Sequence, residues 1–278
     1  MIKNVLVGLD GSEHSRAAIE HALWIARRFG ASLTGLHVID IVSIEGSFLH
    51  DISGSLGFEP YLDFSSKMRE VLQERGRAML EEFGERCRED GVRCETAMDV
   101  GVIANEICAR ARTADLVVIG HRGINEKFST GLLGGTAESV TRKIAKPLLV
   151  CPMEWKEIDR PLLAYDGSAR SASAMQAAAD FCVSTKLPLA VLHVAKDEAG
   201  AEKIIGEAKR YLASYPIEAS FESVPGTAPE QIVARLREKG YGLLFIGAYG
   251  HSRIVEMVLG STTEYVLRNS PCPVFLTR

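Results

Sequence analysis

One stretch near the C-terminal end decides the fold: residues 243–263 read LLFIGAYGHSRIVEMVLGSTT. The four apolar residues at its start are typical of a buried strand. Gly247 and Gly250 then open a loop, and Gly260 and Ser261 stand where a helix begins. Backbone N–H groups and the helix dipole at such a place can hold a phosphate. The same layout also fits an ordinary strand-to-helix turn, so the rest of the chain has to decide.

The composition limits which classes of protein this chain can belong to. The 278 residues are 46% hydrophobic and 24% charged, which is typical of a soluble globular protein, and the net charge of −4 offers no basic surface for nucleic acid or an anionic membrane. No apolar run is long enough to span a membrane, and Met1 to Val5 enter a strand pattern instead of a signal peptide, so we expect a cytoplasmic protein. The six cysteines form no C-x-x-C pair, so neither a zinc site nor a redox dithiol has support.

The start of the chain predicts a βαβ unit. A strand at 5–9 ends at Asp10-Gly11-Ser12, a helix follows at 15–29 with Gly30 as its C-cap, and a second strand covers 32–39. Elements of this order and length imply a parallel sheet with a right-handed crossover.

The chain is an internal duplication. Asp10-Gly11-Ser12 returns as Asp166-Gly167-Ser168, and Leu36-His37-Val38 returns as Leu192-His193-Val194, both 156 residues later. Near the end of each half, KPLLV at 146–150 corresponds to CPVFL at 272–276, only 126 residues later. The first half therefore carries extra residues, which we place in a long loop at about 41–66. Whether this loop covers a ligand, reaches a partner or is disordered stays open.

The remaining pattern gives each half five strands alternating with four helices. In the first half we expect a helix at 67–90, a strand at 92–98, a helix at 104–112 and a strand at 116–119. The counterparts in the second half are 201–215, 217–224, 229–239 and 243–246. The predicted fold class is α/β, with two tandem doubly wound domains at 1–153 and 160–278, each a five-stranded parallel sheet flanked by about four helices.

Candidate ligand groups stand at the ends of the predicted strands. In open parallel sheets, ligands bind at the carboxyl ends, where the strand order reverses. Asp166 ends the first strand of the second half, Val194 ends the second, and the glycine loop follows the fourth. A carboxylate there can accept hydrogen bonds from a sugar, and the backbone at Val194 can recognise an adenine edge. The alternative for Asp10 and Asp166 is an Asp-Gly turn that caps the next helix.

These residues resemble the universal stress proteins, whose nucleotide-binding members carry G-x-x-G, nine residues, then G-[ST]. Gly247-x-x-Gly250, the nine residues 251–259, and Gly260-Ser261 match that motif in full. The resemblance implies the adenine-nucleotide α-hydrolase-like fold and bound ATP, or ADP or AMP, often with Mg²⁺. The nucleotide-binding residues that it implies are Asp166, Val194, Gly247, Gly250, Gly260, Ser261 and Thr262. We add Ala164 at the strand end and His251 and Arg253 inside the loop, where Arg253 either neutralises phosphate charge or is a solvated side chain.

The first half departs from this motif. Gly120-His121-Arg122-Gly123 is present, but ten residues, 124–133, precede Gly134-Gly135-Thr136, and glycine stands at the serine position. An extra residue displaces the phosphate anchors by up to about one Cα step, ~3.8 Å. We therefore expect a weaker first site, formed by Gly8, Asp10, Val38, Gly120, Gly123, Gly134, Gly135 and Thr136.

No other chemistry stands out in the sequence. The histidines have no metal-ligand spacing, and His37 and His193 fit packed, hydrogen-bonded side chains better than ligands. A P-loop, a nucleophile elbow and a kinase motif set are all missing. We expect a nucleotide-binding regulatory module of the stress response. The alternatives are a slow ATP-hydrolysing enzyme of the same superfamily and a structural scaffold.

The resemblance also indicates how the halves assemble. We expect a pseudo-dimer about a two-fold axis, in which residues 148–151 pair with 274–277 because that sheet edge needs cover. Besides the nucleotide, a protein partner and a homodimer of whole chains stay open.

Overall fold

A computed structural model describes residues 2–41, 61–123, 134–195, 198–248 and 259–277, with the backbone alone described at 61–66 and 198–199. The described elements of the first half are β1 (Asn4–Leu9), α1 (Glu13–Phe29), β2 (Ser32–Asp40), α4 (Tyr61–Glu89), β3 (Cys94–Gly101), α5 (Ile103–Arg110), the 3₁₀ turn η1 (Ala111–Thr113), β4 (Leu116–Gly120), α6 (Gly135–Lys143) and β5 (Leu148–Cys151). Those of the second half are β6 (Pro161–Ala164), α7 (Ala169–Thr185), β7 (Leu189–Ala195), α8 (Glu198–Leu212), β8 (Ala219–Pro225), α9 (Ala228–Glu238), β9 (Leu243–Gly247), α10 (Ser261–Asn269) and β10 (Val274–Thr277).

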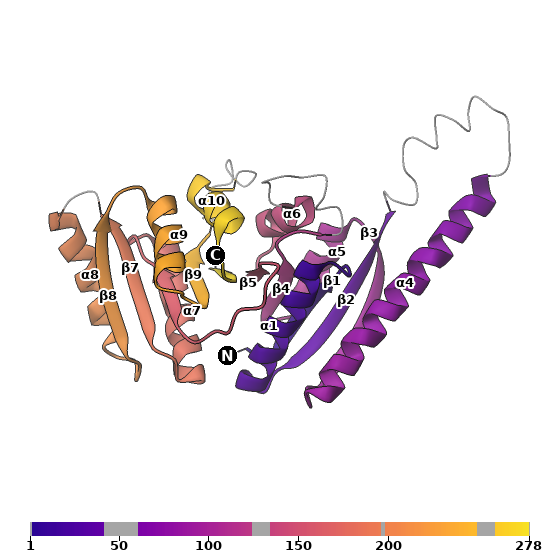
Figure 1. Ribbon diagram of the computed structural model, residues 1–278, viewed down its shortest axis with the longest axis horizontal. Coiled ribbons are helices and arrows are strands. Elements are labelled where there is room, and N and C mark those ends of the chain that lie inside the picture. The colour runs from indigo at the N-terminus through magenta and orange to yellow at the C-terminus, as the bar shows by residue number, and fades with distance from the viewer. Residues whose placement is uncertain (1, 42–60, 124–133, 196–197, 249–258, 278) are drawn as a thin grey trace, which may run out of the picture.

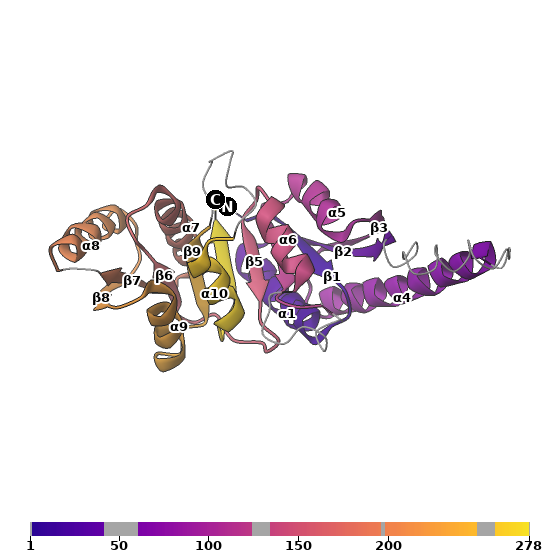
Figure 2. The ribbon, with the colours of Figure 1, turned by 90° about the horizontal axis from the view of Figure 1, so that it is seen from above.

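The ten strands form a single sheet in the order β3-β2-β1-β4-β5-β10-β9-β6-β7-β8. All neighbours within a half are parallel, whereas β5 and β10 pair antiparallel, with Leu149 opposite Phe275. This arrangement confirms the predicted fold class and the predicted pairing of residues 148–151 with 274–277. Figures 1 and 2 show the two halves on either side of this central pair.

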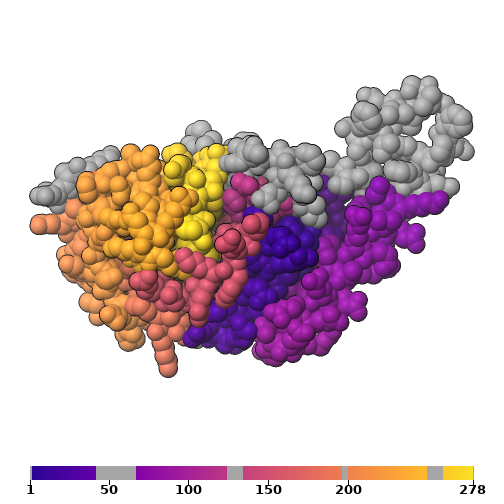
Figure 3. Space-filling view, viewed as in Figure 1, coloured from indigo at the N-terminus to yellow at the C-terminus, as the bar shows by residue number. Residues whose placement is uncertain are grey.

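Strand residues alternate between two hydrophobic cores, one on each face of the sheet. In β1, Val5 and Val7 belong to the first core and Leu6 to the second. Helices α1, α4, α7 and α8 cover the first core, while α5, α6, α9 and α10 cover the second. Each core draws side chains from both halves, and in the space-filling view the halves abut (Figure 3). The tandem domains are therefore packed as one body.

An aromatic cluster fills the centre of the first core. Trp24 stacks on Phe181 with ring centroids 6.0 Å apart, and Phe181 meets the edge of Phe245 at 5.4 Å. Phe245 lies 4.8 Å from Phe275 in the central strand pair. Because Trp24 comes from the first half and the three phenylalanines from the second, this cluster fixes the halves to each other.

The long helix α4 begins earlier than predicted. We expected a loop to Ser66 and a helix from Lys67, but the helix starts at Tyr61. Tyr61, Phe64 and Met68 already have the spacing of apolar residues on one face of a helix. The glycines upstream led us to predict a loop there instead. The predicted helix at 104–112 also ends early, at Arg110, and continues as the turn η1. Within the described ranges, no helix combines the length and apolar character that a membrane crossing needs.

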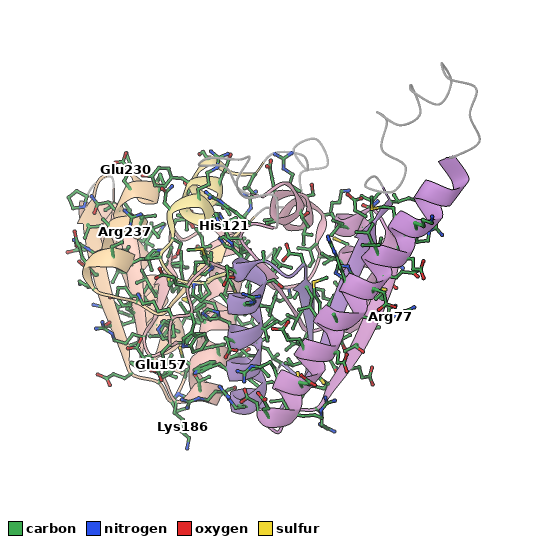
Figure 4. All side chains as sticks on the ribbon, turned by 45° about the vertical axis from the view of Figure 1, so that its right-hand side comes forward. Arg77, His121, Glu157, Lys186, Glu230 and Arg237 are labelled. Carbon is green, nitrogen blue, oxygen red and sulfur yellow. The ribbon has the colours of Figure 1, made fainter. Side chains whose placement is uncertain are left out.

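The two halves end their first helices with the same backbone but different residues. Gly30 caps α1 with φ 60° and ψ 38°, and Lys186 caps α7 with φ 59° and ψ 32°. The Lys186 side chain points away from the body of the molecule (Figure 4). Its packing therefore does not offset the steric cost of the left-handed backbone conformation.

We predict that Lys186→Gly raises the free energy of unfolding by up to about 1 kcal/mol, because glycine adopts this conformation without steric cost. The matched change Gly30→Ala should lower it by about 1 kcal/mol, since no described atom lies within 4 Å of the new methyl group and only the backbone strain remains. Urea denaturation followed by circular dichroism measures both. Equal effects of the same sign would contradict the prediction.

A buried histidine lies beneath the segment that joins the halves. The His21 side chain, on α1, is fully buried, its Nδ1–H donates to the Ala17 carbonyl at 2.7 Å, and its ring centroid lies 4.5 Å from that of Trp155. Burial lowers the pKa of His21 to about 4, and hydrogen bonds to the backbone offset only part of this effect. The ring is therefore neutral at pH 7.

Because the pKa of His21 is lower in the folded chain than its usual 6.5, protonation favours unfolding. The free energy of unfolding should therefore fall as the pH drops through 6.5 towards 4. Protonation linked to His21 alone should lower it by about 2 kcal/mol at pH 5 compared with neutral pH. His21→Phe keeps a ring against Trp155 and removes this titration. Urea unfolding at pH 7 and pH 5 should show a smaller loss for the variant, and an equal loss would exclude His21 as the cause.

Candidate functional site

A cavity of about 440 Å³ opens at the carboxyl ends of the first-half strands. It lies where β1 and β4 are neighbours, which is the point at which the strand order reverses. Its volume is typical of a small-molecule site. All eight residues that the sequence predicted for the first half line this cavity: Gly8, Asp10, Val38, Gly120, Gly123, Gly134, Gly135 and Thr136.

Asp10 organises the turn after β1 and also lines the cavity. Its Oδ1 accepts hydrogen bonds from the Ser12 N–H at 2.9 Å and from the Ser12 hydroxyl at 2.7 Å, and the Ser12 hydroxyl in turn caps α1 through the Ser15 N–H. The Asp-Gly turn of the alternative is thus present, but the residue that caps the helix is Ser12 and not Asp10. Oδ2 lies beside the glycine loop, since a Cβ on Gly123 would come within 2.7 Å of it.

The second half repeats this turn. The Oδ1 of Asp166 accepts from the Ser168 N–H at 3.0 Å, and the Ser168 hydroxyl caps α7 through the Ser171 N–H. Burial raises the pKa of Asp166, but hydrogen bonds from Ser168 and Ser171 outweigh that effect and hold the pKa below its usual value. The carboxylate is therefore ionised at neutral pH, and its stabilising contribution is lost only as the pH falls into the acid range.

The N-terminus of α6 forms the far wall of the cavity. Gly134 is its N-cap and donates its N–H to the His121 carbonyl at 3.2 Å, and the first helical hydrogen bond runs from the Glu138 N–H to the Gly134 carbonyl. The N–H groups of Gly135, Thr136 and Ala137 precede that bond, so they have no partner within the helix. Such a set of N–H groups suits an anion.

The two helix starts have the same local backbone conformation. Gly134 and Gly260 have the same φ of −59° and ψ of 138°, and each accepts the first helical hydrogen bond at 2.9 Å. The expected displacement of the phosphate anchors within the first site stays a prediction. The extra residue falls within 124–133, outside the described residues.

Open space lies in front of both helix starts. A Cβ on Gly135 would meet no described atom within 4 Å, and one on Gly260 would meet only the Thr263 hydroxyl, at 4.0 Å. Since their backbone angles suit any residue, neither glycine is needed for conformation. The space that they leave is available to a ligand.

Gly120 and Gly247 have a packing role that the sequence did not predict. A Cβ on Gly120 would lie 2.7 Å from the Cβ of His14, and one on Gly247 would lie 2.4 Å from the carbonyl carbon of Arg170. These glycines allow the ends of β4 and β9 to approach the first turns of α1 and α7. Close packing of strand against helix therefore requires them, whatever ligand is bound.

The histidines near the cavity are packed side chains. The Nδ1–H of His37 donates to the Leu9 carbonyl and that of His193 to the Tyr165 carbonyl, each at 2.9 Å, which confirms the sequence-based expectation. Burial lowers the pKa of His121 to about 4, with further contributions from the positive charges of Arg122 and Arg268. Arg268 belongs to α10, so the second half contributes to the electrostatics beside the first phosphate loop.

Sequence reasoning placed His37 beside the pocket and Arg122 inside the first phosphate loop, but it missed the apolar part of the lining. The apolar lining residues include Leu36, Ile39, Leu72, Ile103, Ile107 and Ile119, and the further polar ones are His37, Asp40 and Arg122. Periodicity assigns such apolar residues to the core, and only the fold shows that they end at a cavity.

The second-half residues take the matching places in the fold. Ala164 ends β6, Val194 lies in β7, Gly247 ends β9, and Ser261 and Thr262 begin α10. The other predicted residues of this loop, Gly250, His251 and Arg253, lie outside the described residues.

The sequence model of the universal stress protein family matches the chain twice, over residues 1–152 and 157–278. A universal stress protein of Synechocystis sp. is 30% identical over 287 residues, covering 100% of both chains. Another, of Mycolicibacterium smegmatis, is 25% identical and covers 99% of this chain and 96% of its own. A solved universal stress protein structure from Archaeoglobus fulgidus DSM 4304 is 25% identical, with a TM-score of 0.77 over 99% of this chain and 98% of that one.

The two kinds of glycine can be told apart by stability. Gly120→Ala should lower the free energy of unfolding by about 1–3 kcal/mol, because its methyl group would overlap the α1 backbone at His14. Gly135→Ala, at the open start of α6, should leave stability unchanged or raise it by about 0.5 kcal/mol. Urea denaturation compares them. If Gly120→Ala proved harmless, the packing role would be wrong.

Proposed function

Because the chain belongs to the universal stress protein family, we propose that each half binds an adenine nucleotide, ATP or its diphosphate or monophosphate, at the carboxyl ends of its strands. The observation that carries this proposal is the first-half cavity. It combines a strand-end carboxylate at Asp10, apolar lining residues and the N–H groups at the start of α6 that have no partner within the helix. A nucleotide needs these three surfaces for its sugar, its base and its phosphates.

The cavity offers a group for each part of a nucleotide. The backbone at Val38 and the side chains of Ile103 and Ile107 line it and would receive the adenine. Oδ2 of Asp10, whose other oxygen is used in the turn, would accept a hydrogen bond from a ribose hydroxyl. The phosphates would lie against Gly135 and Thr136 at the start of α6. Mg²⁺, where present, would be held mainly by the phosphate oxygens.

We propose a regulatory role instead of a catalytic one. Fast phosphoryl transfer needs a group that positions the nucleophile. In the described cavity, His37 already donates Nδ1–H to the Leu9 carbonyl, and Asp10 uses Oδ1 in its turn. The protein would then act in the cytoplasm by changing a surface that a protein partner reads. Steady ATP turnover by the pure protein would instead favour the slow enzyme of the same superfamily.

The two sites should differ through one hydroxyl. Both helix starts share their backbone angles, but Ser261 in α10 corresponds to Gly135 in α6. A hydrogen bond from a hydroxyl to a charged phosphate contributes about 1.5–3 kcal/mol, or roughly tenfold to hundredfold in affinity. The second half is therefore proposed as the stronger site.

Freshly purified protein, when denatured, should release ATP, ADP or AMP, and isothermal titration calorimetry of nucleotide-free protein with ATP should resolve a tight and a weak site. Gly260→Leu should remove the tight site, because its side chain would fill the space in front of α10. Absence of released nucleotide together with absence of calorimetric binding would refute the proposal.

The hydroxyl exchange provides the matched control. Ser261→Gly should weaken the tight site about tenfold or more, and Gly135→Ser should strengthen the weak site by a similar factor. Gly135 suits this exchange better than Gly134, because a Cβ on Gly134 would press against the Arg122 backbone at 3.1 Å. If both exchanges left the two affinities unchanged, the difference between the sites would have another cause.

A further inference from the structure

Helix α4 is longer than its counterpart α8, and its additional part reaches the cavity. The helix α4 contains 29 residues, whereas α8 contains 15. In the first half, a Cβ on Gly11 would lie 2.8 Å from Met79, and in the second half one on Gly167 would lie 3.4 Å from Ile204. Because the two glycines correspond, Ile204 takes the place of Met79, 125 residues later. By this spacing α8 begins one residue after the counterpart of Leu72, which lines the cavity from α4.

Close packing one helical turn away holds Leu72 at the cavity. Gly76 is buried, and a Cβ on it would come within 2.6 Å of the Cδ2 atom of His37 on β2. The His37 ring is itself fixed by its hydrogen bond to the Leu9 carbonyl at 2.9 Å. Side chains four residues apart lie on the same face of a helix, so the close approach at Gly76 directs Leu72 towards the end of β2. The second half has Ala201 at this place, so its helix cannot make the same approach.

A second apolar side chain lines the cavity from the opposite face of the sheet. Helices α4 and α5 cover different cores (Figure 2), and Ile103, the first residue of α5, lines the cavity together with Leu72. In the second half, the corresponding helix α9 begins with Ala228, also 125 residues later. At the place of Leu72 the sequence has Asp197, which lies outside the described residues. The two large apolar side chains are therefore particular to the first half.

We propose that Leu72 and Ile103 are specificity-determining residues through which the first site recognises the base of its nucleotide, whereas the second site recognises mainly the phosphates. This inference rests on the proposed function and assigns different parts of the ligand to the two halves. A nucleobase has two flat faces, and Leu72 and Ile103 come from helices on opposite faces of the sheet. Covering the base removes apolar surface from water, so the first site gains affinity from that part of the ligand.

The second half has the reverse combination of features. Alanine at position 228 offers less apolar surface than Ile103, and the residue at 197 is not apolar. Ser261, however, supplies a hydroxyl at the helix start, where the first half has Gly135. The phosphates thus contribute a larger share of the binding free energy in the second half, and the base a larger share in the first.

Two parts of ATP test the two halves separately: adenosine, which lacks the phosphates, and inorganic tripolyphosphate, which lacks the base. Isothermal titration calorimetry of the nucleotide-free chain should show adenosine binding at one site per chain. Leu72→Ala should weaken adenosine binding about tenfold, because a branched side chain is lost from the apolar lining, and it should leave the affinity for tripolyphosphate unchanged. Ser261→Gly should have the reverse effect, weakening tripolyphosphate binding and leaving the affinity for adenosine unchanged.

Val71→Ala is the matched control for Leu72→Ala. Val71 precedes Leu72 on α4, but it is 48% exposed and does not line the cavity, so its loss should leave the affinity for adenosine unchanged. Ile103→Ala is a second variant, since it copies Ala228 of the second half, and it should also weaken adenosine binding about tenfold. Urea denaturation checks that each variant is folded, and unchanged tripolyphosphate binding would exclude a general loss of structure.

The outcomes separate this inference from the proposed function. If neither ATP nor adenosine bound to the chain, both would be wrong. If ATP bound but Leu72→Ala and Ile103→Ala left the affinity for adenosine unchanged, only the recognition of the base by these residues would be overturned. The same conclusion would follow if the two variants weakened tripolyphosphate binding as much as adenosine binding.

Discussion

The antiparallel pairing of β5 with β10 is the interaction on which the rest of the structure depends. Each half alone would be an open five-stranded sheet with an unpaired edge at a four-residue strand, and such edges favour association with other chains. Pairing Leu149 with Phe275 and Val150 with Val274 covers both edges at once. It also brings Phe181, Phe245 and Phe275 beneath Trp24, so the backbone pairing and the aromatic cluster stabilise the same junction. Hydrophobic burial then extends through both cores without a break at the domain boundary.

This central pair also determines how the two candidate sites are placed. Neighbouring strands in a sheet are rotated by roughly 20–25° relative to each other. The strand direction therefore changes progressively on both sides of the central antiparallel pair. Helices α6 and α10, whose N-termini face the two sites, lie next to each other over the centre of the sheet (Figures 1 and 2). Arg268 of α10 contributes to the electrostatics at His121, one residue after the end of β4. The second half thus contributes to the electrostatics beside the first candidate site, although the two belong to separate repeats.

The sequence predicted those parts of the fold that depend on local pattern or on the repeat. The strand at 5–9 follows from its apolar run, the Gly30 cap from turn chemistry, and the duplication from the equal spacing of two signatures. The pairing of 148–151 with 274–277 followed from the family resemblance and from the need to cover a sheet edge. The first turns of α4 were missed because Gly54, Gly57 and Pro60 upstream indicated a loop that ran on to Ser66. The packing role of Gly120 and Gly247 was missed because it depends on helices that approach from elsewhere in the chain.

Duplication offers a physical way to separate what the fold requires from what a site requires. At positions where both halves have glycine and a Cβ would strike backbone, as at Gly120 and Gly247, the constraint belongs to the packing of strand against helix. At positions where the backbone is the same and the side chain differs, as at Gly135 and Ser261, the fold accepts either residue. A change at this second kind of position can alter a binding site without loss of stability. Under the proposed function, a hydroxyl gained or lost at the start of the helix would alter the affinity for an anion, while the Gly134 and Gly260 caps keep the same backbone geometry in both halves.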